Sequence, residues 1–115
     1  MPAQPGAAPF HDWNERIERE CYAPVTSAEV LTARGGVAEV VNCLEWMSFD
    51  FGPTLLWWLE RHAPATYAAV LEADAKSVRR TGHGNALAMP YHHPILPLAD
   101  ARDRRTEIRW GIADF

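Results

Sequence analysis

The chain has 115 residues, of which 48% are hydrophobic and 23% charged, and this composition is typical of one folded domain rather than of a disordered segment. Its 15 acidic and 11 basic residues give a formal charge of −4, so a phosphate backbone would meet net repulsion and no nucleic-acid partner is expected. No apolar run approaches the roughly 20 residues that span a bilayer, so no membrane partner is expected either. Cys21 and Cys43 lack CxxC spacing, which favours reduced thiols in a cytoplasmic protein.

The first elements are a lead-in and a short helix. Residues 1–9 are rich in proline, which fixes φ and restricts the preceding residue, so they are predicted to be extended. Asp12 is followed by Glu15 three positions later, a pattern typical of a helix N-cap. A short helix is therefore predicted to run from this cap to about Cys21.

Two extended segments are predicted next. A turn over residues 32–36 precedes a β-branched run at 37–42, which favours a strand. In residues 46–51, apolar and polar side chains alternate with a period of two, which indicates a second strand or extended segment.

Two helices are predicted in the second half of the chain. Residues 53–62 begin with proline, which is well tolerated at the first helical position, and their leucines share one face. A longer helix begins at Pro64, because apolar residues from 67 to 78 recur at spacings of three and four. Asp74 falls within this apolar stripe, and we expect it at the edge of the stripe or bonded to the basic residues 79–80.

A loop-rich region and a final helix complete the predicted elements. Gly82 ends the long helix, residues 85–89 suggest a short buried strand, and prolines fix the loop that follows. Asp100 or Asp103 can cap a last helix that extends to the end of the sequence.

The order of these elements predicts an α/β protein that is rich in helix and has two to three short parallel strands. Strands that alternate with helices are typically joined by helical crossovers and lie parallel. Parallel strands need neighbours on both sides and helices on both faces. So few strands cannot close a barrel.

The polar segment between residues 82 and 94 is the first candidate binding site. It carries His83, Asn85, His92 and His93, whose side chains can donate and accept the hydrogen bonds that sugar hydroxyls require. His83 and His92 could instead merely satisfy loop carbonyls. A metal site is a further alternative, but adjacent histidines usually point apart and no HxH or HExxH spacing occurs, so no metal or other cofactor is expected.

Three other residues are candidates for sugar binding. Trp13 and Trp46 could stack on the apolar faces of sugars. Asp50 lies near the end of the second extended segment, although it could instead cap the helix that begins at Pro53. No residue pattern points to a nucleophile, and no catalytic residue is predicted.

Five motifs together resemble the N-terminal part of glycoside hydrolase family 57 proteins, in particular the long members that carry an extra domain of unknown function. The motifs are His-Asp-Trp-Asn-Glu-Arg-Ile at 11–17, Glu-Cys-Tyr-Ala-Pro at 20–24, Ser-Phe-Asp-Phe-Gly-Pro-Thr-Leu-Leu at 48–56, Gly-His-Gly-Asn-Ala-Leu-Ala at 82–88 and His-Pro-Ile-Leu-Pro-Leu at 93–98.

The resemblance implies a fold and a function. Family 57 proteins have an incomplete (β/α)₇ barrel and act on α-glucans with retention, through a glutamate nucleophile and an aspartate acid. Residues 10–115 would then be a partial barrel domain truncated at both ends, without the catalytic pair. The segment from Gly82 to Pro94 would line the substrate cleft, with Asn85 where many members have a glutamate.

The expected partners are an oligo- or polysaccharide and the rest of the barrel, supplied by flanking sequence. The expected function is therefore substrate binding within a carbohydrate-active hydrolase or transferase. The alternative is a carbohydrate-binding or scaffold protein that keeps the same fold without catalysis.

Overall fold

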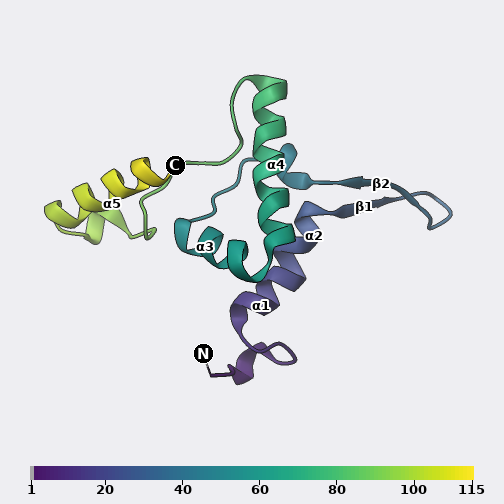
Figure 1. Cartoon of the computed structure of the whole chain (residues 1–115), viewed down its shortest axis with the longest axis horizontal. Helices are drawn as coiled ribbons and strands as arrows, with labels where there is room; N and C mark the ends of the chain where they lie inside the picture. The colour runs from purple at the N-terminus through teal and green to yellow at the C-terminus, as the bar shows by residue number, and fades with distance from the viewer. Residues whose placement is uncertain (1) are drawn as a thin grey trace.

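A long central helix, α4 (Pro64–Thr81), organises the fold, and the other elements lie around it (Figure 1). The structure is a computed structural model that describes residues 2–115, so Met1 of the predicted lead-in lies outside the described residues. The remaining elements, in chain order, are η1 (Pro5–Ala7), α1 (Trp13–Ile17), η2 (Glu18–Tyr22), α2 (Ala23–Thr26), β1 (Ala28–Leu31), β2 (Val37–Val41), η3 (Cys43–Glu45), α3 (Pro53–His62), η4 (Leu96–Leu98) and α5 (Ala101–Asp114).

The first helix begins as predicted but is longer. A carboxylate oxygen of Asp12 accepts a hydrogen bond from the Glu15 amide at 3.0 Å, which confirms the N-cap. The Glu15 carboxylate accepts in turn from the His11 amide at 3.0 Å. The helix then passes Cys21 through the π-helical turn η2 into α2. Pro24 has no N–H to give to the preceding turn, which accounts for a local departure from regular α-helix.

The prediction of a parallel sheet is wrong, because the structure has one two-stranded sheet in which β1 and β2 are antiparallel. The turn predicted at residues 32–36 is confirmed: the Thr32 amide donates to the Gly36 carbonyl at 2.7 Å, and Gly35 has a φ of 79°. So short a connection can join only antiparallel neighbours, because a parallel pair needs a crossover of a dozen or more residues. The strand predicted at 37–42 is therefore half of a hairpin.

The other two predicted strands, at residues 46–51 and 85–89, do not form, and these segments are joined by one isolated parallel bridge between Phe49 and Ala86. The Phe49 amide donates to the Asn85 carbonyl at 3.1 Å, and the Phe49 carbonyl accepts from the Leu87 amide at 2.9 Å. A parallel pair with no further strand at either edge does not extend into a ladder. The expectation of an incomplete (β/α)₇ barrel fragment is therefore corrected: residues 2–115 form a mostly helical structure with a β-hairpin.

The helices predicted in the second half of the chain are confirmed. α3 begins at a proline, and α4 ends at Gly82, whose φ of 87° gives the left-handed C-cap that glycine adopts without strain. The Asp100 carboxylate caps α5 by accepting from the amides of Arg102 at 2.8 Å and Asp103 at 2.9 Å.

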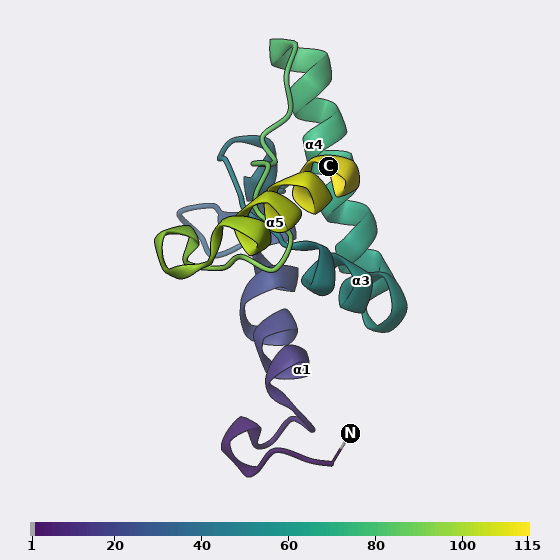
Figure 2. The same ribbon diagram turned by 90° about the vertical axis from the view of Figure 1, so that its left-hand side faces the viewer.

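The core is small and lies against α4. Leu44, Phe49, Val70 and Ala73 form its buried cluster, and Leu59 of α3 is fully buried. The hairpin and α5 project from this body on different sides (Figure 1), and the second view shows α5 crossing in front of it (Figure 2). Among the described residues, no helix is long and apolar enough to cross a membrane.

Candidate functional site

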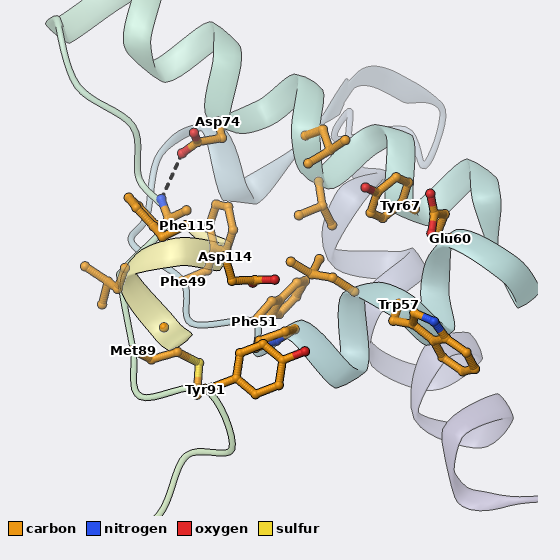
Figure 3. A pocket seen from close by; sticks show the side chains of 17 residues that line it. Phe49, Phe51, Trp57, Glu60, Tyr67, Asp74, Met89, Tyr91, Asp114 and Phe115 are labelled. Carbon is orange, nitrogen blue, oxygen red and sulfur yellow. Dashed lines mark hydrogen bonds between the residues drawn. The ribbon is translucent and has the colours of Figure 1, made fainter. Parts of the chain in front are cut away.

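An open hollow of about 510 Å³ lies between α3, α4 and the end of α5 (Figure 3). Its volume falls in the range of about 300–1,000 Å³ that small-molecule sites occupy. Its apolar wall combines aliphatic side chains with six aromatic rings, namely Phe49, Phe51, Trp57, Tyr67, Tyr91 and Phe115.

The phenylalanine wall follows from the two-residue period of the segment before α3. Phe49 and Phe51 both line the hollow, and their ring centroids lie 5.4 Å apart. Behind them, Tyr22 contacts Phe51 edge to face at 5.1 Å. Burial raises the pKa of the Tyr22 phenol, so this ring stays uncharged and supports the wall. The alternation predicted from sequence thus places two rings on one side without a strand ladder.

Asp74 links α4 to the segment that contains Asn85 and Ala86. Its Oδ1 atom accepts hydrogen bonds from the backbone amides of Asn85 at 2.7 Å and Ala86 at 2.8 Å. A side chain at Gly84 would collide with the same carboxylate, so glycine permits the close approach. Neither sequence expectation for Asp74 named this contact. Two features of the sequence could have indicated this contact: the acidic Asp74 lies within an apolar stripe, and Gly84 directly precedes the two residues whose amides donate to it.

The charged groups that line the hollow are all acidic. Glu60, Asp74 and Asp114 contribute carboxylates, and no lysine, arginine or histidine is found among the lining residues in the described part of the chain. Carboxylates accept hydrogen bonds from hydroxyl groups and repel anions. The arrangement therefore suits a neutral, hydroxyl-rich ligand better than a phosphorylated or carboxylated one.

A second hollow of about 600 Å³ adjoins the first and shares Pro53, Trp57 and Tyr91 with it. Trp57 is 56% exposed, and the Arg61 guanidinium carbon lies 4.0 Å from its ring centroid. This cation–π contact fixes the indole while part of the ring stays open to solvent. Asn14 adds an amide to this second hollow, so a polar group of the first helix also reaches the site.

Two of the predicted cleft residues interact with their own surroundings. His83 is exposed, and its Nδ1 lies 3.2 Å from the Gly84 carbonyl oxygen, within the same loop. The Asn85 side chain donates to the Leu44 carbonyl at 3.1 Å. Asn85 therefore ties the bridge segment to η3, whereas the His83 ring contacts a carbonyl of its own loop.

The other two histidines lie beside α5. The His92 Nδ1 is 2.9 Å from a Glu107 carboxylate oxygen, and the His92 amide donates to the second oxygen at 2.8 Å. These two bonds lower the pKa of Glu107, the backbone bond first and the side-chain bond second. His93 is exposed and has a φ of 53°, in the left-handed region. The pair thus anchors and shapes the loop before α5.

The remaining predicted residues are spread over the surface. Trp13 is 47% exposed, and Trp46 is 67% exposed with the Arg80 guanidinium carbon 3.9 Å from its ring centroid. Asp50 is exposed, and α3 has Gly52 as its N-cap without a side-chain bond. None of the seven predicted residues is among those that line the two hollows of the described chain.

Sequence reasoning therefore missed the residues that do line the site. Tyr91 directly precedes the predicted histidine pair, and Trp57 lies in the helix predicted at residues 53–62. Within residues 2–115, no group of three histidine, cysteine or acidic side chains lies close enough to hold a metal ion. Comparison of the chain with protein-family models, curated proteins and solved structures gives no match.

Proposed function

We propose that the chain binds a neutral oligosaccharide in the aromatic hollow, as the substrate-binding part of a carbohydrate-active protein. The observation that carries this proposal is the combination of aromatic rings and carboxylates in one hollow without a basic group. Sugars present apolar C–H faces that stack on rings such as Trp57 and Tyr91. Their hydroxyl groups donate hydrogen bonds to carboxylates such as Glu60 and Asp114.

The resemblance to glycoside hydrolase family 57 supports the same proposal. Two of the motifs that carry it, at 48–56 and 82–88, supply part of the lining, including Phe51 and Ala86. The proposed role is binding, and no catalytic step is assigned to a residue of this chain. We place the protein in the cytoplasm, where thiols such as those of Cys21 and Cys43 remain reduced.

The test is calorimetric titration of the purified chain with maltohexaose and with cellohexaose. We expect saturable binding of at least one of them. Trp57→Ala should weaken that binding about tenfold, a loss of about 1.4 kcal/mol. Trp46→Ala is the matched control, because Trp46 also carries an arginine over its ring but lies outside the hollow, and its loss should leave the affinity unchanged.

Two outcomes would contradict the proposal. Absence of saturable binding to either hexasaccharide would overturn the function itself. Weaker binding of Trp46→Ala than of Trp57→Ala would move the site to the surface predicted from sequence. Release of reducing ends by the purified chain would instead favour an enzyme over a binding protein, because it would require an acid and a nucleophile within these residues.

A further inference from the structure

The two hollows share one wall. Pro53, Trp57 and Tyr91 line both of them, and these three residues are called the shared wall below. Trp57 and Tyr91 lie along the same edge of the first hollow (Figure 3). A ligand chain that occupies both hollows would therefore cross this wall and contact its two rings.

Helix α3 sets the two hollows side by side. Successive residues of an α-helix turn by about 100°, so residues four apart lie on one line along its surface. Leu56 and Glu60 lie on one flank of the line that carries the shared wall, and they line only the first hollow. Thr54 and Trp58 lie on the other flank and line only the second hollow. The hollows therefore adjoin along one edge of the helix.

The aromatic rings along this edge are held in place within the chain itself. Trp58 stacks on His62 one turn later, with ring centroids 5.1 Å apart and an interplanar angle of 24°. Tyr91 contacts the Trp110 ring edge to face at 5.8 Å. The cation–π contact described above fixes the third ring. Side chains that are already ordered lose little conformational entropy when a ligand binds, so these rings form a preorganised stacking surface.

Each hollow also offers polar groups to sugar hydroxyls. The first contributes the carboxylates of Glu60 and Asp114, and the second contributes the Asn14 amide and the Thr54 hydroxyl. Asn14 and Thr54 are exposed, and neither side chain makes a hydrogen bond within residues 2–115. The second hollow can therefore bind hydroxyl groups without breaking an internal contact.

We propose that the two hollows form one groove, in which a single oligosaccharide lies across the shared wall and places sugar units in both. This inference rests on the proposed function and extends it, because it makes the ligand a chain of several units rather than a mono- or disaccharide. When one ligand joins two binding sites, the second contact becomes intramolecular. The affinity then exceeds that of either site alone.

Calorimetric titration with oligosaccharides of increasing length tests the groove. The probes are maltose, maltotetraose and maltohexaose, with cellobiose, cellotetraose and cellohexaose as the second series. In a series that binds, the affinity should rise with length, and the hexasaccharide should bind at least about tenfold more tightly than the disaccharide. The stoichiometry should be one hexasaccharide per chain.

Asn14→Ala and Glu60→Gln each change one hollow. Because one ligand contacts both hollows, each variant should weaken hexasaccharide binding about threefold to tenfold. Glu72→Gln is the matched control for Glu60→Gln, because both glutamates are exposed and paired with an arginine. The pairs are Glu60 with Arg61 at 3.3 Å and Glu72 with Arg79 at 3.0 Å. Glu72 lines neither hollow, so its replacement should leave the affinity unchanged.

Three results would overturn the inference while sugar binding itself stands. A disaccharide that binds as tightly as its hexasaccharide would confine the ligand to one hollow. Two hexasaccharides per chain would make the hollows independent sites. A hexasaccharide affinity that Asn14→Ala leaves unchanged would exclude the second hollow. If neither hexasaccharide binds at all, the proposed function fails, and the inference fails with it.

Discussion

Replacement of Asp74 by alanine should destabilise the protein and loosen one wall of the hollow. Its Oδ1 accepts two backbone amides, from Asn85 and Ala86. A hydrogen bond to a charged group contributes about 1.5–3 kcal/mol. Asp74 is half-buried, so water would replace part of the two bonds, and we expect a net loss of about 2–3 kcal/mol in the free energy of unfolding. Asp74→Asn keeps the acceptor oxygen without its charge and should lose about half as much.

Urea denaturation measures this loss, and amide hydrogen exchange locates it. The exchange of the Asn85 and Ala86 amides should accelerate more than that of amides in the middle of α4. Glu72→Ala on the same helix is the control, because Glu72 makes an exposed ion pair with Arg79 at 3.0 Å, and such pairs contribute about 0–1 kcal/mol. The reasoning is refuted if Asp74→Ala unfolds at the same urea concentration as the wild type with unchanged exchange at both amides.

Three further predictions concern packing and pH. Leu59→Ala should lower the free energy of unfolding, measured by urea denaturation, by about 2–5 kcal/mol, because the Leu59 side chain is fully buried; a loss below about 1 kcal/mol would contradict this. Gly111→Ala should release α5 from the loop before it, because the added methyl group would collide with the Met89 carbonyl. The fluorescence of Trp110 should therefore shift, and an unchanged spectrum would contradict the collision. The hydrogen bonds from His92 lower the pKa of Glu107 below its ordinary value of 4.5. The bonds therefore stabilise the folded protein above pH 4.5, and this stabilisation is lost as the pH falls through the lowered pKa that Glu107 has in the folded state. An acid titration of Trp110 fluorescence should show this transition and Glu107→Gln should abolish it.

The helices could be predicted from sequence because their signals are local. Capping by Asp12 and Asp100, proline at the start of α3 and glycine at the end of α4 each act within one turn of the chain. Strand direction could not be predicted in the same way. The β-branched run and the turn were recognised, but residues 28–31 were not assigned as a strand, and without that partner the hairpin could not be seen.

The site residues predicted from sequence lie close in sequence to residues that line the hollows, but they do not line the hollows themselves. Histidines were selected because of their hydrogen-bonding chemistry, whereas the direction of a side chain depends on tertiary contacts. His92 turns to Glu107 and Asn85 turns to Leu44, both distant in sequence. Tyr91, next to His92, lines the hollow instead. No periodicity rule distinguishes such neighbours in a loop fixed by proline.

The polar contacts that join distant segments converge on α4. Thr66 donates to the buried Glu18 carboxylate at 2.7 Å, Asn42 donates to the Ala69 carbonyl at 2.9 Å, and Ser77 donates to the Glu45 carbonyl at 3.2 Å. Together with the Asp74 contacts, these bonds attach the first helix, η3 and the bridge segment to one rigid element.

Among residues 2–115, no hydrogen bond joins α4 to either strand of the hairpin or to α5, although α5 contributes Asp114 and Phe115 to the hollow. Segments with few buried contacts open locally at a lower free energy than the core does. A ligand in the hollow would contact both α4 and the end of α5, so it would bind the attached state of α5 more tightly than the detached one. Binding must then shift that equilibrium toward the attached state, because a ligand stabilises a conformation only through its differential affinity for it.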